Sequence, residues 1–361
     1  MMLSASQWNF VGTMLRTNAL LIKGGSDTFS LRSKRLSKYF ANMGDVMKDG
    51  RGIAETAGAY AQHLSSVGDL SYTIVSPAMK GIPMAPTIAV HLYEMTTTSL
   101  PFAFDYKKYE KGMNTEEVLR RERNISSFEE MDVSGAVDEF TGREMYGSVV
   151  DIVPDIDLDS IDAISATDTA GIAVAAAIAQ RAWKIHNKNL RFGYTRPPKE
   201  HGDIKEKLIV GGIQEGDRVL AIGTGIKPVG EFYGDITENT IARIVDDVTT
   251  SGGAIQDTNV KLVGYIPQEN VIGSTVAFYR AETKSEKDPR PVATVLEEAG
   301  LPLSYILTAP ETFKALFLEG AAHGHEGVIG EVEYRSFLDS YRPYSTVDMV
   351  ELEAALEEIG A

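Results

Sequence analysis

Apolar positions recur along this chain with two periods, one typical of helices and one typical of buried strands. A helical period covers residues 5–22 and 51–66, whereas SYTIVS (71–76), LPFAFDY (100–106) and DRVLAIG (217–223) are short runs rich in branched or aromatic side chains. Further helical patterns lie between such runs. The alternation of strand and helix predicts an α/β fold with a mainly parallel sheet flanked by helices.

The second half of the chain continues this alternation. Strands are predicted at IARIVDD (241–247), STVAFYRAE (274–282) and LSYILTA (303–309), and an acidic helical region follows them. Near the start of the chain, TFSLRSKRLSKYFANMG (28–44) predicts a short strand pair. Residues 113–155 interrupt the pattern because they are highly charged and irregular, and they are interpreted as an inserted helix plus a hairpin.

Two segments of the chain match each other without a gap. When residues 72–112 are shifted by 90 positions they fall on residues 162–202, and Gly81 then meets Gly171. Both copies have the pattern of a strand, a turn with glycine, an Ala-rich helix, a strand and a charged loop. The ungapped register favours a duplicated unit, although two βαβ units can share such a generic pattern without duplication.

These patterns divide the chain of 361 residues into five parts. They are an N-terminal helix with short strands, a first βαβ repeat unit, a charged insertion, a core with the DDVTTSGG loop, and a C-terminal helical extension. Their predicted ranges are 1–70, 71–112, 113–155, 156–310 and 311–361. Length alone allows two domains or one elaborated α/β domain.

Composition excludes several kinds of site and segment from this chain. Hydrophobic residues make up 43% and charged residues 24% of the chain, as in ordinary globular proteins, and the lack of cysteine excludes disulfides and thiolate metal sites. The first residues lack a basic region and a continuous apolar run, so no signal peptide is expected. No segment approaches the roughly 18 uninterrupted apolar residues of a membrane span. We therefore expect a cytoplasmic protein without a membrane partner.

The formal net charge of −16 bears on partners. Binding of nucleic acid requires a basic face, so this charge argues against a nucleic acid partner. Anionic small molecules are not excluded, because a local basic loop can bind them. The acidity can also reflect solubility or adaptation to salt.

One stretch, DDVTTSGG (246–253), combines two carboxylates with a loop of hydroxyls and glycines directly after a buried strand. In an open α/β sheet, such a loop lies in the crevice at the carboxyl ends of the strands. Its backbone N–H groups precede a helix that begins near Ala254, and with its hydroxyls they suit a phosphate monoester. The loop residues are Thr249, Thr250, Ser251, Gly252 and Gly253.

The two carboxylates, Asp246 and Asp247, require a different part of the ligand. Like charges repel, so they do not suit phosphate, but they suit the vicinal hydroxyls of a sugar or a hydrated Mg²⁺ that bridges to a pyrophosphate. An acidic strand end with a Ser/Thr N-cap is also common as a purely structural feature. Together, the carboxylates and the loop predict a ligand that carries a ribose, a phosphate and a metal.

The string from Val245 to Gly253 resembles the phosphoribosyl-diphosphate (PRPP) signature of type I phosphoribosyltransferases. The flanking motifs resemble the orotate phosphoribosyltransferases within that class, over roughly residues 5–112 and 160–310. The resemblance implies the type I phosphoribosyltransferase fold with an N-terminal hood, here with an extra βαβ unit. It also implies a Mg²⁺-dependent reaction of PRPP with orotate that gives orotidine 5′-monophosphate and pyrophosphate in pyrimidine biosynthesis.

Two loops resemble the family's pyrophosphate loop. SPAMKGIP (76–83) carries Lys80 at the family's lysine position, whereas ATDTAGIA (166–173) has Ala170 there. The second loop is followed by the better candidate for the catalytic loop, so the PRPP site is assigned to it, with Lys80 as a further candidate. The assigned residues of the second loop are Thr167, Asp168, Thr169 and Gly171.

The segment RPPKEHG (196–202) resembles the family's mobile catalytic loop, although Pro197 and Pro198 depart from the usual pattern. Displacement of pyrophosphate builds negative charge on the leaving group, which the protein must stabilise while it excludes water. The resemblance implies that Arg196, Lys199 and His201 supply contacts to the phosphates; a lysine-rich loop can otherwise be a solvated surface. In the family this loop reaches over the neighbouring subunit's site, which implies a homodimer.

The orotate pocket is likewise implied by the resemblance. Tyr39 and Phe40, in a segment similar to the family's N-terminal motif, offer a stacking face, and Arg32 and Arg280 offer pairing with the orotate carboxylate. Thr250 completes the predicted set. The aromatic pair can also be core residues, and the arginines can be surface charges.

Other functions remain open at this stage. The chain can transfer the phosphoribosyl group to another base, or it can be a non-catalytic regulatory protein that binds PRPP or a nucleotide. PRPP synthesis uses tandem copies of this fold, but its ATP-binding signatures are lacking. Two further motifs, GTGIKPVG (223–230) and HGHEG (323–327), are interpreted as turns; His323 and His325 alone make a weak metal motif.

Overall fold

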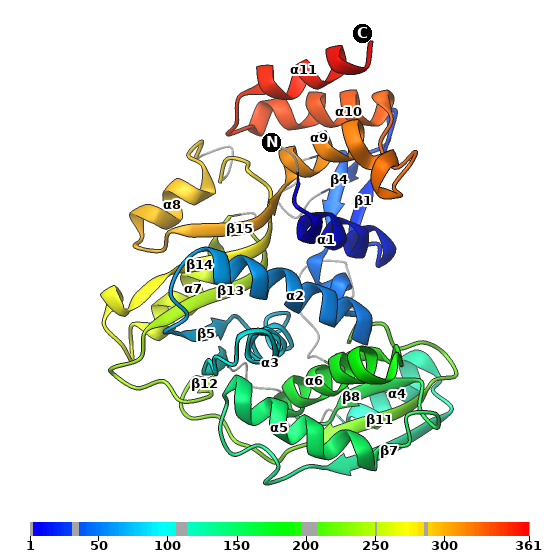
Figure 1. Ribbon diagram of the computed structural model, residues 1–361, viewed down its shortest axis with the longest axis vertical. Helices are drawn as coiled ribbons and strands as arrows, with labels where there is room; N and C mark the ends of the chain where they lie inside the picture. The colour runs from blue at the N-terminus through cyan, green and yellow to red at the C-terminus, as the bar shows by residue number, and fades with distance from the viewer. Residues whose placement is uncertain are drawn as a thin grey trace.

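The computed structural model describes residues 3–30, 36–105, 114–195, 208–249, 251–284 and 288–360. Within these ranges the strands form a six-stranded sheet, a five-stranded sheet and two small two-stranded sheets. Figure 1 shows the larger sheets in different parts of the molecule, with helices α2, α3 and α6 between them. The predicted α/β fold with a mainly parallel sheet flanked by helices is confirmed, with the strands divided between two sheets.

The six-stranded sheet has the order β12-β6-β5-β13-β14-β15, and its neighbours are parallel except β12 and β6. Its strands are β5 (Thr73–Ser76), β6 (Phe102–Asp105), β12 (Phe232–Tyr233), β13 (Ala242–Thr249), β14 (Val271–Tyr279) and β15 (Leu303–Thr308). Strand β13, which ends in the DDVTTSGG loop, lies in the middle between β5 and β14. Most residues of β13 and β14 are buried, as expected for central parallel strands that are covered on both faces.

The five-stranded sheet has the order β10-β9-β8-β11-β7, with only β10 and β9 antiparallel. Its strands are β7 (Ser127–Asp132), β8 (Ala163–Ala166), β9 (Arg191–Thr195), β10 (Ile209–Gly211) and β11 (Arg218–Gly223). The extra βαβ unit expected from the repeat is therefore part of a complete second sheet.

The helices of the described chain cover both sheets. They are α1 (Ala5–Arg16), α2 (Gly50–Ser66), α3 (Met84–Thr96), α4 (Thr115–Arg123), α5 (Gly142–Ile152), α6 (Thr169–His186), α7 (Gly253–Leu262), α8 (Val292–Glu298), α9 (Ala309–Glu319), α10 (Glu331–Tyr341) and α11 (Met349–Gly360). None of these helices combines the length and apolar character needed to cross a bilayer.

The two copies of the predicted repeat have the same local structure. Strands β5 and β8 begin at Thr73 and Ala163, which are 90 residues apart, and each leads through a helix to a parallel neighbour, β6 or β9. The shared sequence pattern therefore produces one β–α–β unit in each large sheet.

Helix α6 shows why the units pack together. It is rich in alanine, and it is buried along almost its whole length because it packs on α2 and α3 as well as on its own sheet. Asp168 caps its N-terminus by accepting a hydrogen bond from Gly171 N at 2.6 Å. Small side chains on all faces allow close approach of several neighbours, so the two sheets share one hydrophobic core.

Two expectations about local structure were wrong. The first helix ends at Arg16 rather than near residue 22, because Asn18 is left-handed (φ 57°) and Leu20–Ile22 forms strand β1 against β4 (Tyr39–Ala41). The charged insertion forms a helix, a single strand and a second helix. It contains no hairpin within its described residues, because β7 pairs in parallel with β11.

The strand pair predicted within residues 28–44 is confirmed, and a further strand of this segment pairs with β1, which precedes it. Strand β2 (Phe29–Ser30) pairs with β3 (Leu36–Ser37), and β4 pairs with β1. Figure 1 shows β1, β4 and α1 at the same end of the molecule as the C-terminal helices α9, α10 and α11. The N-terminal strands therefore pack on the C-terminal helical region.

Candidate functional site

Three parallel strands bring the candidate residues of the six-stranded sheet together. Strands β5, β13 and β14 are adjacent and parallel, so their carboxyl ends meet at one edge of the sheet. The loops that follow Ser76, Thr249 and Tyr279 therefore lie at one edge of the sheet, and it is at this edge that ligands bind in open α/β sheets.

The acid pair lies at this edge and is buried. Asp246 and Asp247 are each 6% exposed. Asp246 Oδ1 accepts a hydrogen bond from Asp247 N at 2.9 Å, which holds the first carboxyl against the backbone. Burial, followed by the charge of Asp247, raises the pKa of Asp246 well above its usual value. The pair thus provides two adjacent carboxyl groups, and deprotonation of Asp246 is unfavourable.

Lys80 is the cation of this site. Its Nζ lies 3.1 Å from Asp247 Oδ2 and donates to Asn42 Oδ1 at 3.0 Å. Burial lowers the pKa of Lys80, but attraction by Asp247 and Asp246 outweighs burial, so that the net shift is upward. The ammonium group is therefore held charged next to the acid pair.

The backbone around Lys80 is tightly folded. A Cβ atom on Gly81 would lie 2.5 Å from the Pro77 carbonyl oxygen, and Ser76 Oγ donates to the Gly81 carbonyl at 2.8 Å. Only glycine fits this turn without displacement of the backbone. The turn directs the residue before it, Lys80, toward β13.

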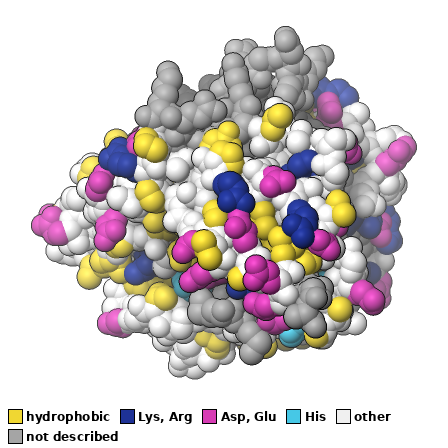
Figure 2. Space-filling view, turned by 90° about the horizontal axis from the view of Figure 1, so that it is seen from above, with side chains coloured by type: hydrophobic (Ala, Val, Ile, Leu, Met, Phe, Trp, Pro, Cys, Tyr) yellow, Lys and Arg dark blue, Asp and Glu magenta, His cyan; other side chains and the backbone are white. Residues whose placement is uncertain are grey.

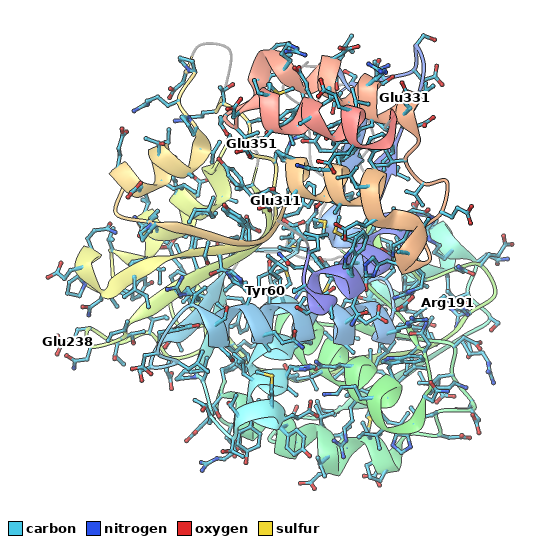
Figure 3. All side chains as sticks on the ribbon, turned by 45° about the horizontal axis from the view of Figure 1, so that its top comes forward. Tyr60, Arg191, Glu238, Glu311, Glu331 and Glu351 are labelled. Atoms are coloured by element: carbon cyan, nitrogen blue, oxygen red, sulfur yellow. The ribbon has the colours of Figure 1, made fainter. Side chains whose placement is uncertain are left out.

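Tyr60 supports the acid pair from helix α2. Its hydroxyl donates to the Asp246 backbone carbonyl. Tyr60 lies on α2 near the centre of the molecule (Figure 3). Burial, and then the nearby carboxylates, raise the pKa of Tyr60 well above its usual value, so the hydroxyl remains a donor.

The hydroxyl-and-glycine loop begins with an internal hydrogen bond. Thr249 Oγ1 accepts from Gly252 N at 3.0 Å, and Gly252 is left-handed, with φ 76°, directly before α7. Among the described residues, no side chain forms a capping hydrogen bond with this helix. Ser251, directly before it, is exposed, whereas Thr250 lies outside the described residues.

Arg280 is buried rather than open to the crevice. Its guanidinium group is 4% exposed and pairs with Glu282 at 2.7 Å, and the Tyr39 ring stacks 4.3 Å from it. Tyr39 donates its hydroxyl to the same Glu282 oxygen at 2.8 Å. Burial raises the pKa of Tyr39 well above its usual value. The structure thus joins Arg280 and Tyr39 in one internal cluster with Glu282.

The remaining base-pocket candidates have different surroundings. Tyr39 is 1% exposed and packs on Phe278 and Phe313, so its ring is part of the core. Phe40 is 38% exposed and contacts Phe29 with ring centroids 5.9 Å apart. Arg32 lies outside the described residues, as do the three candidates of the catalytic loop, Arg196, Lys199 and His201.

The second pyrophosphate-loop candidate lies at the other sheet. Thr167, Asp168, Thr169 and Gly171 follow β8, and β8 pairs with β11 and β9. Pairing of β5 with β13 instead brings the first loop to the acid pair. The structure thus places Lys80, and not the residues after β8, beside Asp247.

Some residues of the site were not predicted. Glu282 lies within the AFYRAE motif, and its charge next to Arg280 was a usable signal. Asn42 and Tyr60 gave no such signal, because their contacts with Lys80 and Asp246 join segments 38 and 186 residues apart.

The two histidines of the HGHEG motif pack against an aromatic side chain. His323 and His325 stack on Trp8, with ring centroids at 4.1 and 5.9 Å. Over the described ranges, no three histidine, aspartate or glutamate side chains gather as ligands for a metal ion.

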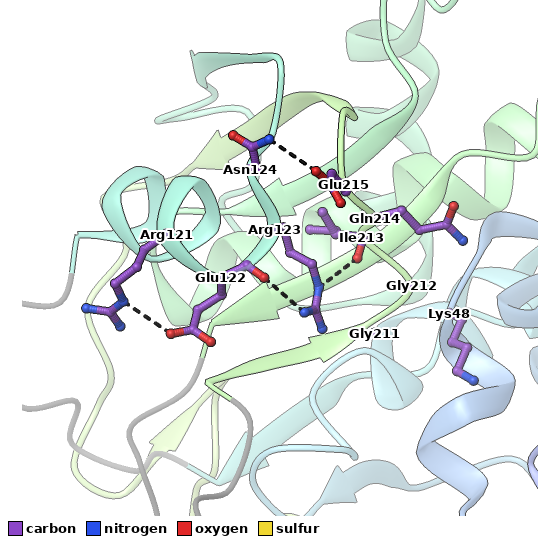
Figure 4. Close-up of a pocket in the computed structure, with 10 residues that line it drawn as sticks. All are labelled: Lys48, Arg121, Glu122, Arg123, Asn124, Gly211, Gly212, Ile213, Gln214 and Glu215. Carbon is purple, nitrogen blue, oxygen red and sulfur yellow. Dashed lines mark hydrogen bonds and ion pairs between the residues drawn. The ribbon is translucent and has the colours of Figure 1, made fainter.

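The charged surface does not mark a further candidate site. Figure 2 shows lysine and arginine side chains interspersed with acidic ones on the described part of one face. A cavity of about 540 Å³ lies beside β10, and Figure 4 shows the residues that line it. There Arg123 donates to the Ile213 carbonyl at 3.0 Å and Asn124 donates to Glu215 at 3.2 Å. These polar groups are engaged with each other, and no residue predicted for the site lines this cavity.

Comparison with known proteins supports the resemblance. No model of a known protein family matches the chain. It is similar to orotate phosphoribosyltransferases of Chromohalobacter salexigens, with 42% identity over 80 residues, and of Saccharophagus degradans, with 37% identity over 106 residues. The matches cover 22% and 29% of this chain but 34% and 47% of the relatives, so the chain spans less than half the length of the relatives it matches.

A solved structure also aligns with the chain. An orotate phosphoribosyltransferase from Francisella tularensis aligns over 93% of this chain and 99% of its own, with 16% identity and a TM-score of 0.44. The predicted resemblance to orotate phosphoribosyltransferases is confirmed by the sequence matches.

Proposed function

We propose that this chain is an orotate phosphoribosyltransferase. It transfers the 5-phosphoribosyl group from PRPP to orotate and releases orotidine 5′-monophosphate and pyrophosphate. The proposal rests on the sequence relatives and on one arrangement, in which an acid pair, a lysine and an uncapped helix N-terminus meet at one sheet edge.

Each part of this arrangement suits one part of PRPP. The carboxylates of Asp246 and Asp247 accept hydrogen bonds from vicinal ribose hydroxyls, and the N–H groups before α7 suit the 5′-phosphate. Lys80, next to the acid pair, would neutralise the pyrophosphate. We therefore assign the pyrophosphate to the loop of Lys80.

The acid pair also fits Mg²⁺, whose preferred ligands are oxygens. Asp247 Oδ2 is buried, and apart from the Lys80 ammonium group at 3.1 Å no donor in the described part of the chain contacts it. A bound Mg²⁺ would neutralise charge on the pyrophosphate. Asp246 and Asp247 would hold it, with water completing its coordination.

The chain's own residues supply charge stabilisation rather than a nucleophile. Negative charge develops on the leaving pyrophosphate, and a fixed cation in a buried site stabilises it more than a cation in water does. The resemblance adds Arg196, Lys199 and His201 as contacts to the phosphates. In the family the corresponding loop reaches over the site of the neighbouring subunit, so this role would require a homodimer.

The direct test is release of pyrophosphate from PRPP and orotate, with and without Mg²⁺. Lys80→Ala is expected to lower kcat/KM by about 100-fold. Lys188→Ala, in which a surface lysine that pairs with Asp159 is removed, is the matched control and should leave turnover unchanged. No turnover with any base, together with unchanged PRPP affinity in Lys80→Ala, would instead indicate a non-catalytic binding protein.

A second candidate is transfer to another base. It is favoured by Arg280, whose charge is already paired with Glu282 and covered by Tyr39. A carboxylate on the base would then compete with an internal partner. A panel of purine and pyrimidine bases, each tested with PRPP for pyrophosphate release, distinguishes the two reactions.

A further inference from the structure

A polar cluster lies at the amino end of the six-stranded sheet, at the opposite end from the acid pair. Its central residue is Arg243, the second residue of β13, whose strand partners are Ile74 of β5 and Gly273 of β14. Asp247 is four positions further along β13, so the two residues are roughly 13 Å apart along the strand. The cluster is therefore separate from the proposed PRPP site.

Strand register places the neighbours of Arg243 on its own face of the sheet. Side chains alternate between the two faces, so Tyr72 and Thr275 point to the same side as Arg243. Ser304 pairs with Thr275 in register and shares this side. The contacts agree, because the Arg243 guanidinium carbon lies 5.3 Å from the centre of the Tyr72 ring and Nη1 donates to Thr275 Oγ1 at 3.4 Å.

Helix α2 adds an imidazole to this face. Burial, followed by the charge of Arg243, lowers the pKa of His63. His63 is thus a neutral neighbour of the guanidinium group. The cluster combines one cation with an imidazole, a phenol and two hydroxyls, and none of these groups carries a negative charge.

Arg243 has no counter-charge within the described ranges. No carboxylate there pairs with it, and its one hydrogen bond is the long contact with Thr275. Its Nε is buried and meets no acceptor in the same ranges. A guanidinium group has five N–H donors, and withdrawing its charge from water without acceptors is unfavourable. This is a half-buried cation with unused donors in a chain whose formal net charge is −16.

Two further polar groups of the cluster are buried without a hydrogen-bond partner in the described part of the chain. They are the hydroxyl of Tyr72, a residue only 5% exposed, and Nε2 of His63. A phenol and an imidazole N–H both donate, and leaving such groups unpaired in the interior costs stability. A ligand with several acceptor oxygens would satisfy both groups together with Arg243.

We propose that this cluster binds a tetrahedral oxyanion such as inorganic phosphate. The guanidinium fork matches two oxygens of such an ion. The Tyr72 hydroxyl and the His63 imidazole then require further oxygens, which a phosphate has and a carboxylate lacks. Because Arg243 is half-buried rather than enclosed, the ion reaches the cluster from solvent.

A bound ion would join α2 to β13 and to the residue before β5, so it should stabilise the folded chain. In thermal unfolding of the full chain, phosphate at ten times its Kd is expected to raise the Tm by about 3 °C. Sodium chloride at equal ionic strength is the reference, and acetate at the same concentration should give a clearly smaller rise than phosphate.

Arg243→Met distinguishes a binding residue from a structural one. Without phosphate its Tm should be higher than that of the wild type, because an unpaired, half-buried charge is removed. Its affinity for phosphate in calorimetry should fall by about tenfold or more. Arg335→Met, in which an exposed arginine that pairs with Glu331 is removed, is the matched control and should bind phosphate as the wild type does.

Two more variants locate the ion. Tyr72→Phe removes only the unpaired hydroxyl, so it should weaken phosphate binding by about fivefold without lowering the Tm of the phosphate-free protein. Lys80→Ala alters the proposed PRPP site at the other end of β13 and should leave phosphate affinity at the cluster unchanged.

Four outcomes overturn the proposal. They are the absence of phosphate binding in the wild type, wild-type affinity in folded Arg243→Met, equal stabilisation by acetate and phosphate, and loss of binding in Lys80→Ala but not in Arg243→Met. The last would place the ion beside the acid pair. No group of the acid pair takes part in this site, so its failure leaves the proposed transferase reaction standing, and a chain without turnover still binds phosphate here.

Discussion

Asp246→Asn is expected to make the protein more stable at neutral pH. Asp246 is 6% exposed, and burial together with the charge of Asp247 raises its pKa in the folded state. Asparagine has nearly the same shape and keeps the oxygen that accepts from Asp247 N at 2.9 Å. The substitution therefore removes the cost of charging a buried carboxyl with little change in packing.

The sign and size follow from proton linkage. Because the folded pKa is raised, the folded chain keeps this proton after the unfolded chain has lost it. The stability that the proton contributes is complete below the unfolded pKa of about 3.9 and is lost as pH rises through the folded pKa. Over that window, the stability of Asp246→Asn relative to wild type should grow by about 1.4 kcal/mol per pH unit.

The assay is urea and thermal denaturation of both proteins at a series of pH values from 4.5 to 7.5. Each kcal/mol corresponds to roughly 2 °C in Tm for a chain of this size. Asp69→Asn, which changes an exposed carboxyl outside the site, is the control and should follow the wild-type curve. The reasoning would be refuted if the difference in stability between Asp246→Asn and the wild type stayed constant across the pH series. A Tm of Asp246→Asn below the wild-type value at pH 7.5 would also refute it.

Three further changes test other contacts. Gly252→Ala should lower the free energy of unfolding in urea by about 1–2 kcal/mol, because φ is 76° and a Cβ would lie 3.1 Å from Leu296. An unchanged urea midpoint would contradict this. Glu282→Gln should lower the free energy of unfolding by about 3 kcal/mol in the same measurement, because it leaves the buried guanidinium of Arg280 without a counter-charge. An unchanged free energy of unfolding would mean that the charge of Arg280 is solvated. Asp168→Asn should cost about 1–3 kcal/mol, seen as a lower Tm, because an amide N–H₂ would face N–H donors; an equal Tm would show that this carboxylate does not hold the loops together.

Much of the fold was predictable because the deciding signals are local. Buried parallel strands are short apolar runs, and the helices between them carry a helical period, so the alternation of elements follows from neighbouring residues. The 90-residue repeat was visible for the same reason, and strands β5 and β8 begin that far apart. The hairpin expected in the insertion was wrong because the partner of β7 is β11, about 90 residues further along.

The base-pocket candidates show the limit of local signals. The sequence singled out Tyr39 and Arg280 by their resemblance to a motif, but it could not show that they contact each other and Glu282 in the interior. The contact between Tyr39 and Glu282 joins positions 243 residues apart. Their burial depends on packing of the N-terminal strands on the C-terminal helices, which no short window of sequence records.

The chemistry at the end of β13 follows from local sequence, since two carboxylates, three hydroxyls and two glycines lie within residues 246–253 and need only a strand before them and a helix after them. Long-range packing, in contrast, selects which of two similar loops supplies the neighbouring cation. That choice depends on whether β5 or β8 pairs with β13, and the observed pairing with β5 brings Lys80 to Asp247. Two repeats with the same local pattern have the same local preference, so the difference arises from the long-range pairing of their strands.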